Sequence, residues 1–141
     1  MKIDKKIYQD LYKSIITPRL IEEKMLNLLR QGKLSKWFSG IGQEAISVGV
    51  TKALKANDTI FTMHRNLGVF TSRNIPLENL FGQIIGNELG FTKGRDRSFH
   101  FGVPQYNIIG MISHLAAMLP VACGVGLGYK LKKQNRVAVA F

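Results

Sequence analysis

The sequence predicts an α/β fold in which helices flank a parallel sheet. Two observations support this class. Segments with apolar residues at helical spacing alternate along the chain with short apolar runs that have strand character. The last of these runs, residues 137–141, is continuously apolar, which is typical of a strand buried on both faces. Helices that alternate with such strands favour a layered fold with a parallel sheet.

The first 30 residues predict helix, because apolar residues recur at helical spacing on both sides of Pro18. Thr17 and Pro18 allow two interpretations. They could cap and begin a second helix, or they could mark a kink within one long helix. Gly32 is the expected stop. We assign residues 1–36 to an N-terminal helical segment and residues 37–141 to the first part of an α/β domain.

Five further elements follow in order. Residues 43–56 predict a helix whose inward face carries Ile46, Val50, Ala53 and Leu54. Residues 59–63 predict a short strand, and residues 76–85 predict a helix that begins at a proline and ends at Gly86. Residues 91–106 lack any periodicity and predict a long loop, a kind of segment that is often functional. Residues 119–132 predict a helix rich in small residues, which leads to the strand at 137–141.

Composition and charge limit the function. The chain has 141 residues, of which 45% are hydrophobic, so it is long enough to bury a core as one domain. A single cysteine excludes a disulfide framework, and the N-terminus resembles neither a secretory signal nor a transit peptide. These features predict a reducing, cytoplasmic location. The net charge of +11 favours an anionic partner.

Two alternatives to a soluble enzyme are disfavoured. The apolar stretch 108–129 is long enough to span a membrane, but Pro120, His114 and several glycines interrupt it. A buried glycine-rich helix explains it better. The positive charge would suit a nucleic-acid-binding module, but the sequence holds no helix-turn-helix, RNP-like or zinc-finger pattern. We therefore expect neither a membrane nor a nucleic acid as partner.

Ligands of parallel sheets bind beyond the carboxyl ends of the strands, and two places qualify. One is His64-Arg65, directly after the first strand, and the other follows Phe141. The Arg65 guanidinium offers a planar fork for phosphate or carboxylate, although a surface arginine paired with an acid is an equal alternative. Residues 92–102 form either an anion-contacting loop or a solvated loop in which Asp96 and Arg97 pair locally.

Other residues that could suggest a functional site are better explained by helix packing or burial in the core. The glycines at 124, 126 and 128 lack a preceding strand, so they predict close helix packing, not dinucleotide binding. Cys123 is expected to be inert core, and His114 a satisfied buried side chain. His64, His100 and His114 lack metal-ligand spacing, so the sequence predicts no metal site among them.

Several segments, taken in order, resemble a known enzyme family. They are Arg19-Leu20-Ile21-Glu22-Glu23, Gly42-Gln43-Glu44-Ala45, His64-Arg65-Asn66-Leu67-Gly68, Lys93-Gly94-Arg95 with Ser98-Phe99-His100, and Ile112-Ser113 with Leu115, Leu119-Pro120 and Gly124. This series is similar to the alpha subunit of the thiamine-diphosphate-dependent decarboxylase component of 2-oxo acid dehydrogenase complexes. Ile-Ser-x-Leu points to the branched-chain, 2-oxoisovalerate dehydrogenase type.

The resemblance implies oxidative decarboxylation of a 2-oxo acid, followed by acyl transfer to a lipoyl group. It implies thiamine diphosphate and Mg²⁺ as cofactors. The implied partners are a beta subunit or fused beta half, in an α2β2-type assembly, and a lipoyl-bearing acyltransferase. Pyruvate or acetoin dehydrogenase alpha subunits are the alternative within the family.

The resemblance also assigns residues. Arg65 matches the arginine that grips the diphosphate, and His64 stands beside it where the family usually has tyrosine. Ser113 and Leu115 match the segment that meets the aminopyrimidine, with Leu115 as an apolar wedge under the bent cofactor. His100 matches a histidine of an active-site loop.

Two departures from the family pattern matter. Potassium-ligand positions of branched-chain members fall on Ala117 and Met118, so we expect no potassium site of that kind. The metal-binding Gly-Asp-Gly or Gly-Glu-Gly motif should follow the last strand and is absent. The Mg²⁺ ligands are therefore expected downstream of Phe141. The sequence predicts an α/β domain truncated before this motif and inactive on its own.

Overall fold

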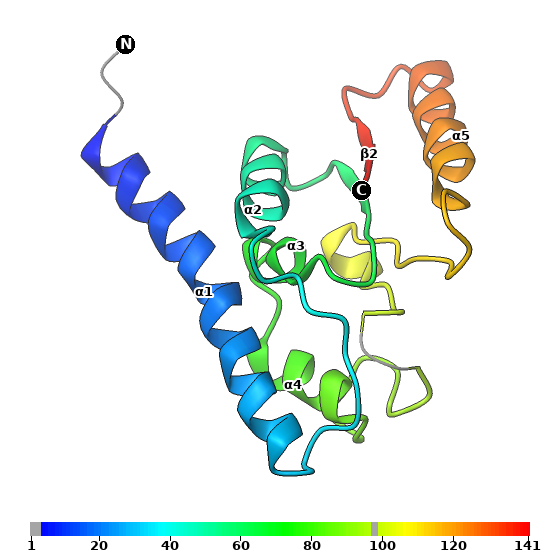
Figure 1. Cartoon of the computed structure of the whole chain (residues 1–141). Helices are drawn as coiled ribbons and strands as arrows, with labels where there is room; N and C mark the ends of the chain where they lie inside the picture. Colours follow the sequence, from blue (N-terminus) through cyan, green and yellow to red (C-terminus); the bar gives the residue numbers. More distant parts are fainter. Residues whose placement is uncertain (1–3, 97–98) are drawn as a thin grey trace.

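The computed structural model of the chain describes residues 4–96 and 99–141. Figure 1 shows a long helix at one side of the molecule, a cluster of shorter helices at the centre, and the last helix at the opposite side. The elements in order are α1 (Lys5–Arg30), α2 (Glu44–Ala53), β1 (Thr59–Phe61), α3 (Leu67–Ser72), α4 (Leu77–Ile85), the 3₁₀ turn η1 (Pro104–Tyr106), α5 (Met118–Leu131) and β2 (Ala138–Ala140).

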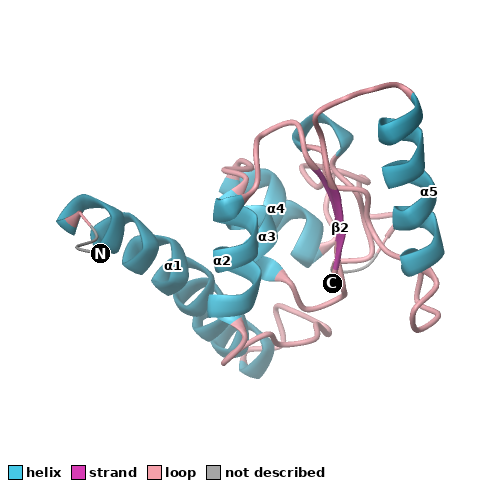
Figure 2. Ribbon diagram, turned by 90° about the horizontal axis from the view of Figure 1, so that it is seen from above, coloured by secondary structure: helices cyan, strands magenta, loops and turns pink. Residues whose placement is uncertain are grey.

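The two strands pair in parallel, with Ile60 opposite Val139. The other edge of β1 pairs with the segment around Ile108, because the Ile60 N–H donates to the Asn107 carbonyl at 2.9 Å. Viewed from above, α5 lies on one side of the sheet and α2, α3 and α4 lie on the other (Figure 2). The mixed helical structure with a parallel sheet confirms the α/β class.

Helix α1 decides between the two interpretations of Pro18. It is one continuous helix of 26 residues with Pro18 inside it. The Thr17 hydroxyl donates to the Lys13 carbonyl at 2.7 Å within the helix, so it does not cap a second one. Ile21 and Met25 on the second half of α1 are buried in the core. The helix ends at Arg30, and Gly32 follows with φ +71°, as predicted for the stop.

The inward face predicted for α2 is wrong at two of its four positions. Ile46 is 61% exposed and Ala53 is exposed, whereas Val50 and Leu54 are half-buried and Leu54 packs against the core. The fully buried residues of α2 are Glu44, Ser47, Val48 and Thr51. The reason is close approach between α2 and α3. A Cβ atom on Gly68 of α3 would collide with the Ser47 hydroxyl, so this face needs small side chains. Apolar spacing alone could not reveal that contact.

In the described parts of the predicted loop, residues 91–96 and 99–106, the one helical element is the short turn η1 at its end, as expected for a loop. Its aromatic side chains anchor it to the core. The Phe101 ring stacks on Phe70 with centroids 4.9 Å apart and on Phe91 at 5.5 Å, and Phe99 is fully buried. Helix α3, only six residues long, was not predicted, because a single turn and a half leaves no periodic pattern.

The burial predicted for His114, Cys123, the glycine-rich helix and the last strand is wrong. Ala122 is the one buried residue that the structure describes on α5, and Cys123 and His114 are exposed. A Cβ on Gly124, Gly126 or Gly128 would meet open space, so no described residue packs on these glycines. Strand β2 is half-buried, because β1 is the one described strand beside it. Among the described residues, no helix combines the length and the apolar character that crossing a membrane requires.

Candidate functional site

A tight turn at the carboxyl end of β1 presents His64 and Arg65. Two hydrogen bonds close this turn. The Met63 N–H donates to the Asn66 side-chain oxygen at 2.7 Å, and the Asn66 N–H donates to the Met63 carbonyl at 3.2 Å. Asn66 is buried, and α3 begins at the next residue. The two candidate residues therefore project from a turn that is fixed on both sides.

The Arg65 guanidinium has no acidic partner among the described residues. Its Nη2 lies 3.0 Å and its Nε 3.3 Å from the Nε2 of His64. The ion pairs among the described side chains join Arg19 to Glu44 and Lys52 to Asp10, so no described carboxylate neutralises Arg65. Of the two alternatives left by the sequence, the arginine paired with an acid is the one that the described residues do not support. The charge of Arg65 remains available to an anion.

The His64 side chain contacts Arg65 and the rings of Phe38 and His100. Burial, the charge of Arg65 and the nearby His100 all lower the pKa of His64. Its ring meets the edge of Phe38 with centroids 4.6 Å apart, and it stacks on His100 at 6.3 Å. The lowered pKa favours the neutral imidazole, which accepts the hydrogen bond from Arg65. An incoming anion would replace that acceptor.

A cleft of about 70 Å³ opens beside this turn. Thr62, Met63, His64 and Phe141 line it from the carboxyl ends of the two strands, and the segment 111–119 lines it from the other side. None of the described lining residues is acidic. The Thr62 hydroxyl is buried and has no hydrogen-bond partner among the described residues. The cleft thus brings an unpartnered hydroxyl and the His64 imidazole together, next to the Arg65 guanidinium that contacts this imidazole.

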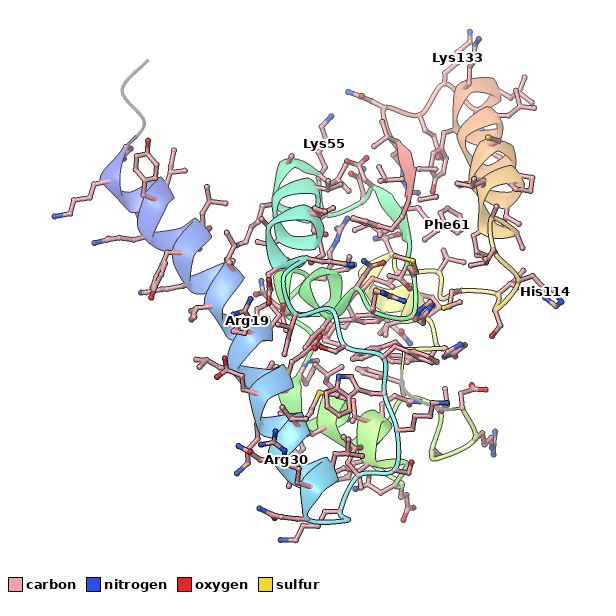
Figure 3. The ribbon with its side chains drawn as sticks, viewed as in Figure 1. Arg19, Arg30, Lys55, Phe61, His114 and Lys133 are labelled. Carbon is pink, nitrogen blue, oxygen red and sulfur yellow. The ribbon has the colours of Figure 1, made fainter. Side chains whose placement is uncertain are left out.

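Ser113 and Leu115 lie on the far side of the same cleft. Both are exposed, and Leu115 is 90% exposed, which is unusual for a large apolar side chain. His114 between them points outward, away from the sheet (Figure 3). His100 lines a neighbouring cleft that shares Met111, Ile112 and Met118 with the first. Four of the five predicted site residues, His64, His100, Ser113 and Leu115, therefore line two adjoining clefts. Arg65 lines neither cleft and is placed beside them by its contact with His64.

The sequence did not reveal the residues that support this site. Thr62 and Phe38 gave no signal, because neither belongs to a recognisable motif. Gln83 offered one, as a polar residue within the apolar helix α4. Its fully buried side chain donates to the Thr92 hydroxyl and the Asp96 carbonyl, both at 2.9 Å, and so ties down the loop that leads to His100.

Three predictions are not tested by the described residues. Arg97 and Ser98 lie outside the described residues, so the predicted Asp96–Arg97 pair is untested. In the described ranges, no group of three or more His, Cys, Asp or Glu side chains could hold a metal ion. The Mg²⁺ ligands expected downstream of Phe141 stay a prediction, as does the domain boundary at residue 36.

The fold and the site define an α/β protein with the His64-Arg65 turn at the carboxyl end of its first parallel strand. The family model of the dehydrogenase E1 component matches residues 12–141, so the chain belongs to this family. Its relatives include "2-oxoisovalerate dehydrogenase subunit alpha 1, mitochondrial" of Arabidopsis thaliana, which is 30% identical over 99% of this chain and 29% of the relative.

Similar matches come from animals. The 2-oxoisovalerate dehydrogenase alpha subunit of Caenorhabditis elegans is 32% identical over 93% of this chain and 31% of its own length. The human protein is 31% identical over 93% of this chain and 29% of its own. The chain thus spans less than a third of these relatives. All three are named as mitochondrial, so the cytoplasmic location predicted from the sequence is wrong.

Proposed function

We propose that this chain is the N-terminal part of the alpha subunit of a thiamine-diphosphate-dependent 2-oxo acid dehydrogenase of the branched-chain type. The whole enzyme would decarboxylate a 2-oxo acid oxidatively and transfer the acyl group to a lipoyl arm. The observation that carries the proposal is Arg65, which projects from the carboxyl end of β1 without a carboxylate partner among the described residues. Membership of the dehydrogenase E1 component family supports it.

Arg65 and His64 would hold the diphosphate. The planar guanidinium can donate two parallel N–H bonds to phosphate oxygens once it leaves the His64 nitrogen. His64 lies next to it, and once Arg65 leaves its Nε2 the ring can take the tautomer that donates a hydrogen bond from that nitrogen. The Thr62 hydroxyl is a third donor, buried at the strand end and without a described partner. Because no described lining residue is acidic, none of them would repel the anion.

Ser113 and Leu115 would meet the organic part of the cofactor. Thiamine diphosphate, when bound, supplies the electron sink for decarboxylation. Leu115 has almost no contact with the rest of the chain, so its apolar surface is available as a wedge under a bent ligand. His100, stacked on His64, would border the same space from the loop.

The remaining parts of the proposal concern residues and chains other than those described. We expect the Mg²⁺ ligands downstream of Phe141, because the cleft has no carboxylate oxygen among its described lining. The domain would then be an incomplete thiamine-diphosphate-binding fold. The proposed partners are a beta subunit or fused beta half, in an α2β2-type assembly, and the lipoyl-bearing acyltransferase.

Calorimetric titration with thiamine diphosphate tests the proposal. We expect Arg65→Gln to weaken binding by at least about tenfold, the effect of losing a charge-assisted bidentate contact. Arg30→Gln is the matched control, since Arg30 is an exposed arginine at the end of α1, far from the cleft (Figure 3). Equal affinities for the wild type and Arg65→Gln would overturn the assignment.

A further inference from the structure

The geometry points to Glu22 of α1 as a positioning residue for the Arg65 site, acting through the segment 37–42. This inference rests on the proposed function, because it supposes that Arg65 binds an anion. It adds a residue from a helix that forms no part of the cleft lining. The link consists of three contacts: Glu22 to the Gly40 backbone, Gly40 to the Arg65 backbone, and Phe38 to His64.

Glu22 is a buried carboxylate that is surrounded by donors. It is 2% exposed, and its two oxygens lie 2.9 and 3.0 Å from the Gly40 N–H. The Ser39 hydroxyl donates to it, and the Trp37 indole N–H lies 3.5 Å away. None of the described cations forms an ion pair with it. A carboxylate is costly to bury, so these donors from a single segment fix that segment strongly against α1.

Gly40 links the Glu22 carboxylate to the site, because its backbone packs against the main chain of Arg65. A Cβ atom on Gly40 would collide with the Arg65 carbonyl oxygen and would lie 3.3 Å from a Glu22 oxygen. The glycine backbone is therefore wedged between the carboxylate of Glu22 and the main chain of Arg65. Any shift of the segment away from Glu22 would move or release the Arg65 turn.

Phe38, in the same segment, contacts the imidazole rings of His64 and His100. Its ring lies 4.6 Å from the His64 ring and 6.4 Å from the His100 ring, centroid to centroid. The far end of the segment is also fixed, because the Gly42 N–H donates to Glu44 at 2.9 Å and Glu44 pairs with Arg19 of α1 at 2.6 Å. Arg19 points from α1 toward α2 in Figure 3. Helix α1 thus holds both ends of the segment whose middle contacts the site.

The test uses the full chain, inorganic pyrophosphate as probe, and two readouts. One is the dissociation constant for pyrophosphate, and the other is the NMR signal of the His64 imidazole, which the Phe38 ring current shifts. Glu22→Gln and Gly40→Ala should raise the dissociation constant by about tenfold, since a charged contact is displaced. Both should move the His64 signal.

The controls are Glu23→Gln, at an exposed acid next to Glu22, and Gly49→Ala, whose added Cβ meets open space. Neither should change either readout. Ser39→Ala is a milder variant that removes one donor to Glu22 from an exposed position, and it serves if the stronger variants do not fold. We expect it to move the His64 signal and weaken pyrophosphate binding by about threefold.

Folded variants with wild-type affinity and an unmoved His64 signal would overturn the role of Glu22. A wild-type chain that binds no pyrophosphate would overturn the proposed function instead. The His64 signal would then decide the positioning role independently. The two failures are therefore distinguishable.

Discussion

Polar side chains lie at both ends of strand β1, but the two ends differ in how many of these side chains are hydrogen-bonded within the chain. At the amino end, the Asp58 carboxylate accepts the Lys55 N–H at 2.8 Å and the Val137 N–H at 2.9 Å. At the carboxyl end, Arg65 has the imidazole of His64 as its acceptor, and the Thr62 hydroxyl has no described partner. The carboxylate at the amino end is therefore bonded by its own chain, whereas the carboxyl end leaves bonding capacity unused.

The arginines show the contrast most clearly. Arg73 donates to the carbonyls of Lys55, Ala56 and Asp58. Arg136 donates to the Asn57 carbonyl at 2.6 Å and stacks over the Tyr129 ring at 4.5 Å. Both tie the amino end of the sheet together. An arginine satisfied by backbone carbonyls stabilises a fold, whereas one that faces a neutral imidazole is available to a ligand.

The largest expected effect is the loss of Asp58. Asp58→Ala would leave two backbone N–H groups without their acceptor beside the partly buried Arg73. We expect the free energy of unfolding in urea to fall by about 3 kcal/mol, as for other broken buried networks. Glu88→Ala, at an exposed acid, should change it by less than about 0.5 kcal/mol. A similar decrease in the free energy of unfolding for Asp58→Ala and Glu88→Ala would show that the hydrogen bonds at the amino end of β1 do not stabilise the fold.

A pair of arginine variants sharpens the comparison. Arg136→Ala removes hydrogen bonds and the stacking contact with Tyr129, so it should lower the free energy of unfolding by about 1.5 kcal/mol. Among the described residues, Arg65→Ala removes side-chain hydrogen bonds to His64 only, so its cost should stay below about 0.5 kcal/mol. Urea denaturation of both variants measures the difference. A larger cost at Arg65 than at Arg136 would reverse our assignment of the two ends.

The pH dependence of stability gives a smaller effect. Because burial and neighbouring charges lower the pKa of His64, the unfolded chain binds its proton at a higher pH than the folded chain. Stability should therefore fall as the pH drops from the ordinary histidine pKa of 6.5 through the lower folded value. His64→Gln should remove up to about 1 kcal/mol of this loss between about pH 7.5 and 5.5. An identical pH profile for the variant would contradict the burial of His64.

The smallest effect on stability is expected at Leu115. Leu115→Ala should change the free energy of unfolding by less than about 0.3 kcal/mol, because the side chain is almost fully exposed. It should still weaken thiamine diphosphate binding by about fivefold, while pyrophosphate binding stays unchanged. Calorimetric titration with both ligands separates the two contributions. Equal losses for both ligands would contradict a wedge under the organic part.

The sequence predicted the elements better than their packing. Helices α1, α4 and α5 were found because their periodicity, prolines and glycines are local signals. The buried face of α2 was predicted only in part, because the close approach of Gly68 to Ser47 is a contact between separate helices. Burial of β2 and α5 was expected from their apolar character, but burial depends on neighbours that the described chain does not supply.

The candidate site was predictable in part, for a related reason. His64 and Arg65 follow a recognisable strand, and the position of ligands beyond the carboxyl ends of strands is a general rule. Ser113, Leu115 and His100 came from the family resemblance. Glu22, Gly40 and Phe38 act across long sequence separations, so no local pattern pointed to their place beside the site.

An amide NMR titration with pyrophosphate tests the central claim most directly, because it observes both ends of β1 in one experiment. We predict shifts at residues 62–66 and 111–116, around the cleft, and none at residues 55–59 or 136–138. Shifts confined to the amino end, or spread evenly over the basic surface, would contradict the claim that the carboxyl end of β1 is the anion site.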